Sequence, residues 1–299
     1  MRLIKQSAEY IPQDPTILGA FKLIERAGRT CYKSESKITE DSWIKFIQML
    51  QGKHHYSPFE FGTIYLTIDT GSPFTNPHYL EETDLVYFYL RNKYSKVKSE
   101  NNSTQTGTIY YITTNLRVMF ENKRLEDLHY ACEPTKHERR YCVKLITSRD
   151  ITHEYVRHRT MSFCQESTRY CNYSGDKFGN QITYIIPSWT NLSEGECTKP
   201  NELDTTFYNA LLDSEAYYFD LLNEGWKPQQ ARQVLPNALK TEIMMCGFES
   251  DWEHFFELRM GEGAHPTARE LAFMIRDEFI NNSVDFHTII HIDKDEYKK

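Results

Sequence analysis

The segment that begins at residue 157 gathers side chains that can hold an anion. Residues 157–159 read Arg-His-Arg, and Ser167, Thr168 and Arg169 follow within one short stretch. An arginine binds a phosphate through a planar fork of N–H groups, and hydroxyls with backbone N–H groups complete such a cradle. The segment therefore predicts a site for a small anionic ligand, although an isolated Arg-His-Arg is also typical of a solvated turn.

Ser167 allows two interpretations. A nucleophilic serine needs an adjacent base and a third group that orients this base. The arginines near Ser167 stay protonated and are poor bases. We therefore favour phosphate binding by Ser167 and keep covalent catalysis as the alternative.

The elements around this segment must hold it in place. Apolar periodicity predicts a helix over residues 151–156 that delivers Arg157 to a loop. Other strands are expected at residues 3–6, 63–68, 110–114 and 143–147, and other helices at 16–26, after Asp41, and at 205–224, 228–234, 238–245, 252–259 and 267–279. A polar run predicts an exposed loop over residues 98–107. We expect one α+β domain over residues 1–299, with a mixed or antiparallel sheet flanked by helices.

Composition excludes several classes of protein. With 39% hydrophobic and 26% charged residues the chain resembles ordinary globular proteins, and its net charge of -7 argues against nucleic-acid binding. Its 7 cysteines are odd in number and have no CxxC spacing, which predicts reduced thiols rather than a disulfide scaffold or a zinc module. The His-Glu pair at residues 153–154 lacks the second His of an HExxH motif, so no metal is expected. The chain shows neither an apolar signal segment nor a stretch of about 20 apolar residues, which predicts a soluble, cytoplasmic protein without membrane contact.

The spacing around residue 157 is also specific. Arg157-His158-Arg159, seven further residues and then Ser167 resemble the RHRx7S signature of the flavin-dependent thymidylate synthases, and Arg169-Tyr170 extends the likeness. Four other segments resemble motifs of this family in the family's order: Arg-Thr-Cys-Tyr at residues 29–32, His-Tyr-Ser-Pro-Phe-Glu at 55–60, Ala-Arg-Gln-Val-Leu-Pro at 231–236, and Leu-Arg followed by Ala-His-Pro at 258–266. Relative to short members of the family, the region of about residues 70–140 looks like an insertion.

The resemblance implies an enzyme that converts dUMP to dTMP. In this family methylenetetrahydrofolate supplies the carbon, NADPH reduces FAD, and the flavin passes a hydride to the pyrimidine. Members are homotetramers whose active sites combine residues of several subunits.

Carried over residue by residue, the resemblance implies three roles. The residues expected at the cofactor are Ser57, Arg157, His158, Arg159, Gln165 and His254. Those expected at the substrate are Glu154, Arg157, Gln165, Ser167, Thr168, Arg169, Arg232 and Arg259. Arg259 is also expected to be catalytic, because a cation against the uracil ring stabilises the negative charge that develops there.

The chain departs from the family pattern at several positions. Cys164-Gln165 stands where Asn-Glu is common, Glu154 replaces a Gln, and Thr267 replaces the Gln of an HAQ motif. Residues 248–250 read Phe-Glu-Ser and lack the Arg of the family's Asn-x-Arg stretch. Two alternatives therefore stay open: a related enzyme that modifies a pyrimidine nucleotide differently, for example by hydroxymethylation, and a catalytically silent nucleotide-binding protein.

Overall fold

The computed structural model describes residues 1–103, 106–169, 171–175, 178–196 and 202–284. At its centre lies a four-stranded antiparallel sheet in the order β2-β6-β10-β7. The strands are β2 (Ser7–Ile11), β6 (Arg140–Ser148), β10 (Lys240–Phe248) and β7 (Ser162–Gln165). In this register Met244 of β10 lies opposite Lys144 of β6 and Cys164 of β7. Since side chains alternate along a strand, even-numbered residues of these three strands share one face.

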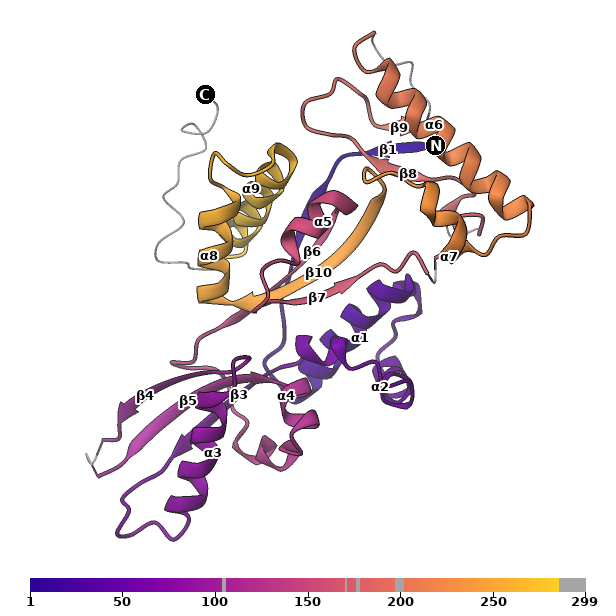
Figure 1. The fold of residues 1–299 in the computed structure, drawn as a ribbon. Helices are drawn as coiled ribbons and strands as arrows, with labels where there is room; N and C mark the ends of the chain where they lie inside the picture. Colours follow the sequence, from indigo (N-terminus) through magenta and orange to yellow (C-terminus); the bar gives the residue numbers. More distant parts are fainter. Residues whose placement is uncertain (104–105, 170, 176–177, 197–201, 285–299) are drawn as a thin grey trace.

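Three helices cover the other face of the central sheet. They are α5 (Arg149–Tyr155), α8 (Glu249–Arg259) and α9 (Pro266–Asn281), drawn together on one side of the sheet in Figure 1. Val143, Leu145, Ile243 and Met245 of the sheet pack there against fully buried Trp252 and its neighbours. This is the main core, and it fixes the ends of α5 and α8 relative to each other.

The even-numbered face packs against α1 (Ile17–Tyr32), and α2 (Ser42–Gly52) lies beyond α1 (Figure 1). The N-terminus of α1 is capped by Thr16, whose hydroxyl accepts a hydrogen bond of 3.0 Å from the Gly19 N–H. Its C-terminus ends at Lys33, which adopts the left-handed conformation with φ 48°. A 3-10 helix, η2 (Ser57–Phe61), follows α2 and packs against α1 and β7.

Two smaller sheets flank the central one. β1 (Arg2–Ile4) pairs with β8 (Thr183–Ile185) and β9 (Gly195–Glu196), beside α6 (Thr205–Asn223), α7 (Pro228–Ala231) and η5 (Arg232–Val234). At the opposite end, β3 (Thr63–Asp69), β5 (Thr108–Asn115) and β4 (Lys96–Asn101) form the third sheet with α3 (Tyr79–Arg91), α4 (Leu116–Glu121) and η3 (Leu125–Tyr130). The short η1 (Glu35–Lys37) joins α1 to α2.

The α+β class with an antiparallel central sheet is confirmed, and most expected elements are present. The expected helix over residues 238–245 is wrong, because this segment leads into the central strand β10. All residues of β10 after Lys240 are buried, so neither of its faces shows the polar alternation of a half-buried strand, and such a short run cannot be assigned by periodicity. The loop expected over 98–107 is wrong in its first part, because residues 98–101 belong to β4. Asp41 precedes α2 but makes no side-chain capping bond.

The expectation of reduced cysteines is also corrected. Cys142 and Cys246 form a disulfide across β6 and β10, where the two residues are directly paired and their Cα atoms lie 4.1 Å apart. The pair is separated by 104 residues in sequence, so no local spacing could have indicated it. Cys31, Cys132 and Cys164 carry free thiols.

Among the residues that the structure describes, no helix is both long and apolar enough to cross a bilayer.

Candidate functional site

Arg259, the last residue of α8, connects several of the predicted site residues. Its Nε donates to His158 Nε2 at 3.0 Å, its Nη1 donates to Glu154 Oε2 at 2.7 Å, and its Nη2 donates to the Glu154 carbonyl at 2.7 Å. His254 precedes Arg259 in the same helix, and its ring meets the His158 ring edge-on, with 6.0 Å between the ring centroids. We call Glu154, His158, His254 and Arg259 the Arg259 cluster. The structure thus brings together residues that are 105 positions apart in sequence.

His158 is uncharged at neutral pH. It is 8% exposed. Burial, together with the positive charge of Arg259, lowers the pKa of its imidazole to about 4. A neutral imidazole can accept the Arg259 N–H through Nε2 and keeps its proton on Nδ1. His158 therefore orients Arg259 as a hydrogen-bond acceptor rather than repelling it.

Three of the residues expected at the cofactor lie on the surface. Arg157 and Arg159 are exposed on either side of buried His158, in the turn that follows α5. Ser57 is exposed at the start of η2. The Arg-His-Arg segment thus directs its two cations outward while its imidazole points into the Arg259 cluster.

A second group of predicted residues lies beyond β7. Arg232 at the start of η5 donates from Nη1 to the Thr168 hydroxyl at 2.7 Å. The Ser167 N–H donates to the Cys31 carbonyl at 3.1 Å, and its hydroxyl accepts from the Arg169 N–H at 3.3 Å. We call Ser167, Thr168, Arg169 and Arg232 the Arg232 group; Tyr170 lies outside the described residues. No acidic or imidazole side chain is hydrogen-bonded to Ser167 within the described chain, which favours binding over nucleophilic catalysis for this serine.

Gln165 lies between the two groups. Its amide donates to the Thr152 hydroxyl at 2.9 Å and to the Thr241 hydroxyl at 3.2 Å. Thr152 belongs to α5, which also carries Glu154, whereas Gln165 ends β7 just before the Arg232 group. One end of the central sheet therefore positions both groups.

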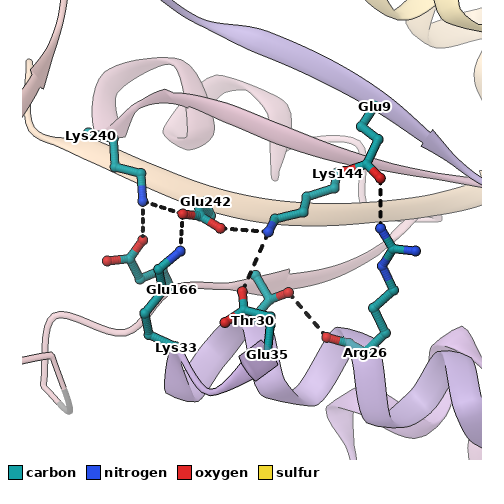
Figure 2. Close-up of polar contacts among 9 residues, drawn as sticks. All are labelled: Glu9, Arg26, Thr30, Lys33, Glu35, Lys144, Glu166, Lys240 and Glu242. Carbon is teal, nitrogen blue, oxygen red and sulfur yellow. Dashed lines mark hydrogen bonds and ion pairs between the residues drawn. The ribbon is translucent and has the colours of Figure 1, made fainter. Parts of the chain in front are cut away.

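A buried ion network lies beneath the Arg232 group and was not predicted. Figure 2 shows Lys240 between the carboxylates of Glu166 and Glu242, with Lys144 and Lys33 reaching Glu242 from β6 and from the end of α1. Lys240 Nζ lies 2.9 Å from Glu166 Oε2, and Lys144 Nζ lies 2.7 Å from Glu242 Oε2. Burial would raise the pKa of the Glu242 carboxyl, but the lysines around it hold this pKa well below its usual range. The network connects Glu166, the residue before Ser167, to strands β6 and β10 and to the end of α1.

The sequence did contain a signal for this network. Lys240 and Glu242 are two residues apart, the spacing that places side chains on one face of a strand. The predicted helix over residues 238–245 gave no indication of this network, because residues two apart do not face each other on a helix.

Comparisons with known proteins show the family of the chain. Residues 78–282 match the family model described as thymidylate synthase complementing protein. This range exceeds half of the chain, and the chain belongs to this family. Two proteins named flavin-dependent thymidylate synthase are similar to it: one from Pyrococcus furiosus is 32% identical over 131 residues (44% of this chain and 50% of that protein), and one from Geobacter sulfurreducens is 34% identical over 125 residues (42% and 49%). The chain spans about half the length of the curated relatives it matches.

One solved structure is also similar. It is a UMP/dUMP methylase from Streptomyces cacaoi bound with 5-Br dUMP, with a TM-score of 0.41 and 16% sequence identity over 95% of this chain and 92% of that chain.

Proposed function

We propose that this protein is an enzyme that methylates dUMP to dTMP, with methylenetetrahydrofolate as carbon donor, FAD as cofactor and NADPH as reductant. The observation that carries the proposal is the Arg259 cluster. A single guanidinium joins Glu154, expected at the nucleotide, to His158, expected at the flavin. Family membership supports the same reaction.

The residues present suit a flavin dinucleotide. Its pyrophosphate needs cations and hydroxyls, and Arg157, Arg159 and Ser57 are exposed and able to supply them. His254 is exposed beside His158 at the edge of the same cluster. When bound and reduced, the flavin supplies the hydride that completes the new methyl group.

Arg259 is the residue proposed to act on the pyrimidine. A guanidinium beside the uracil ring stabilises negative charge that develops on the ring. Three hydrogen bonds to Glu154 and His158 fix its orientation before substrate arrives, so little reorganisation is needed. Glu154 contacts Arg259 through Oε2 and its carbonyl, and its Oε1 is proposed to accept a hydrogen bond from a donor on the base.

The Arg232 group is proposed to bind the nucleotide's phosphate. Arg232 and Arg169 supply charge, and Ser167 and Thr168 supply hydroxyls next to backbone N–H groups. Gln165 is proposed to contact both ligands, because it stands between this group and the Arg259 cluster. We further propose one domain over residues 1–299 and a homotetramer with shared active sites.

Purified protein tests the proposal directly. We expect a yellow protein with flavin absorbance near about 450 nm, and flavin-dependent NADPH oxidation that yields dTMP from dUMP and methylenetetrahydrofolate. The mass of the product distinguishes a methyl from a hydroxymethyl group. A colourless protein that cannot be loaded with FAD and forms no modified nucleotide would refute the proposed reaction and favour a silent nucleotide-binding protein.

A further inference from the structure

Two free thiols meet where α1 packs against the central sheet. Cys31 lies in the last turn of α1, and Cys164 lies on the even-numbered face of β7, opposite Met244 of β10. The Cys164 thiol is within hydrogen-bonding reach of the Cys31 sulfur. Because a disulfide joins two sulfurs at about 2.05 Å, two thiols already in contact need little movement to form a covalent bond between α1 and β7.

The two thiols differ in their access to solvent. Cys164 is 2% exposed and belongs to a buried apolar cluster that also contains Cys142 and Cys246. Cys31 is only partly buried and packs against this cluster from α1. A small reagent from solvent can therefore reach Cys31, whereas Cys164 is accessible only through its contact with Cys31.

The two thiols also differ in acidity. The hydrogen bond from Cys164 lowers the pKa of the Cys31 thiol, and a hydrogen bond with the Gln165 backbone acts in the same direction, although burial opposes both. The same thiol contact and complete burial raise the pKa of Cys164 well above its usual range. Since the thiolate is the nucleophile, Cys31 is the thiol that reacts first.

Packing alone does not require this arrangement. A buried cysteine often serves only as a small apolar side chain, and Cys132 shows a different environment, since its sulfur contacts the Thr67 hydroxyl at 3.0 Å and the His137 ring rather than a second thiol. An accessible thiol of lowered pKa beside a second thiol is typical of cysteines that respond to oxidants. Cys31 and Cys164 have these properties.

We propose that Cys31 and Cys164 form a reversible redox-active dithiol, which a small-molecule disulfide oxidises to a second intramolecular disulfide. The Cys31 thiolate attacks one sulfur of the reagent, so that a mixed disulfide forms and one thiol leaves. Cys164 then attacks the Cys31 sulfur, and the second thiol leaves. The two cysteines lose two electrons and two protons, and the reagent gains them as two thiols.

The new bond would reinforce the attachment of the segment that follows β7. The Ser167 N–H already donates to the Cys31 carbonyl at 3.1 Å. In the oxidised protein a covalent bond also joins β7 to α1 next to this hydrogen bond. We therefore expect slower hydrogen exchange at the Ser167 amide and a higher urea midpoint of unfolding. The inference goes beyond the proposed reaction and does not depend on it.

Peptide mapping tests the proposal on the full chain. The folded protein is treated with oxidised glutathione at about pH 8, its remaining thiols are blocked with iodoacetamide, and it is digested with trypsin. Cleavage after Lys and Arg places Cys31 in the peptide of residues 30–33 and Cys164 in that of residues 160–169, each with no other cysteine. We expect these two peptides to become covalently linked, and dithiothreitol to separate them again.

Three variants test the order of the two steps. Cys164→Ala keeps the attacking thiol without its partner, so the reaction should stop at a mixed disulfide between Cys31 and glutathione. Cys31→Ser should leave Cys164 unmodified, because Cys164 is buried. Cys132→Ser is the matched control, since Cys132 is also a partly buried free thiol, and it should form the linked peptide to the same extent as the unaltered protein.

The unaltered protein decides the matter even where a variant does not fold. Absence of the linked peptide from the folded protein would overturn the inference, whether Cys31 stays reduced or remains a mixed disulfide. A link that forms only after the protein is unfolded in urea would overturn it as well, because the folded contact would then play no part. Modification of Cys164 in folded Cys31→Ser would contradict the proposed order of attack.

Discussion

Lys240→Met is expected to destabilise the protein strongly, because it removes the cation between two buried carboxylates. Glu166 is 2% exposed and Glu242 is 4% exposed. Lys240 is the only ion-pair partner of Glu166 in the described chain, whereas Glu242 also contacts Lys33 and Lys144. The substitution therefore leaves Glu166 as an uncompensated buried charge while Glu242 keeps two partners.

The size of the effect follows from the geometry. At the observed 2.9 Å between Lys240 Nζ and Glu166 Oε2, the gross attraction is about 6 kcal/mol for an effective dielectric constant of about 20. The substitution also removes the desolvation cost of burying the Lys240 ammonium group, which offsets part of this lost attraction. Loss of one partner from a buried pair costs about 3–5 kcal/mol, and we expect this range for Lys240→Met.

Urea unfolding followed by far-UV circular dichroism measures the change. At pH 7.5 we expect the midpoint for Lys240→Met to fall with an unchanged slope. Glu166→Gln alone is expected to cost less, since Lys240 keeps Glu242. The double substitution should recover more than about 1 kcal/mol relative to the sum of the two single losses.

The same assay has a defined pH dependence. The pKa of Glu242 is held below its unfolded value of 4.5, so its contribution to stability is present above about pH 4.5 and is lost as the pH falls towards the folded-state pKa. Lys240→Met weakens this contribution, so its stability curve and that of the unaltered protein should converge below about pH 4.5. A loss below about 1 kcal/mol at pH 7.5, or a difference that widens in acid, would refute the reasoning.

Three further predictions concern the site and the sheet. Ser167→Ala is expected to raise the dUMP dissociation constant about fivefold to tenfold, which corresponds to the loss of one hydrogen bond. The variant should still turn over at saturating dUMP. Abolished turnover with unchanged dUMP affinity would instead indicate that Ser167 is a nucleophile. The folded-state pKa of His158 is about 4 and its unfolded value is 6.5, so its contribution to the free energy of unfolding is fully present above about pH 6.5 and falls by up to about 3 kcal/mol as the pH drops to 4. In urea titrations, His158→Gln should therefore lose less stability between pH 6.5 and 4 than the unaltered protein. An unchanged pH profile would contradict the assignment. The double substitution Cys142→Ala and Cys246→Ala should lower the free energy of unfolding by about 2–4 kcal/mol under oxidising conditions. A reductant should make this difference from the unaltered protein smaller. Equal stability of the two proteins without reductant would show that the disulfide contributes nothing.

The sequence singled out residues that the structure partly brings together, but it missed much of the structure that supports them. Arg157-His158-Arg159, Ser167 and Arg259 could be singled out because their spacing resembles family motifs that are readable along the chain. The structure brings Glu154, His158, His254 and Arg259 together, whereas Arg157, Arg159 and Ser57 lie exposed on the surface.

The unpredicted parts depend on contacts between distant segments. β10 was read as a helix because burial on both faces removes the alternation that identifies a strand. Once β10 is missed, the ion pairs of Lys240 and the pairing of Cys142 with Cys246 cannot be inferred, since each depends on the register between β10 and its neighbours.

The contact between α1 and the end of β7 also bears on where an autonomously folding unit begins. The family match starts at residue 78, yet the Ser167 N–H is bound by the carbonyl of Cys31, and Glu242 is paired with Lys33. A fragment cut at residue 78 would lose strand β2 from the edge of the central sheet and would expose the apolar surface under α1. Such a fragment is expected to aggregate or to fold incompletely. The first 77 residues are thus part of the scaffold on which the matched region depends, and shortened versions of this protein for crystallisation or engineering need to retain them.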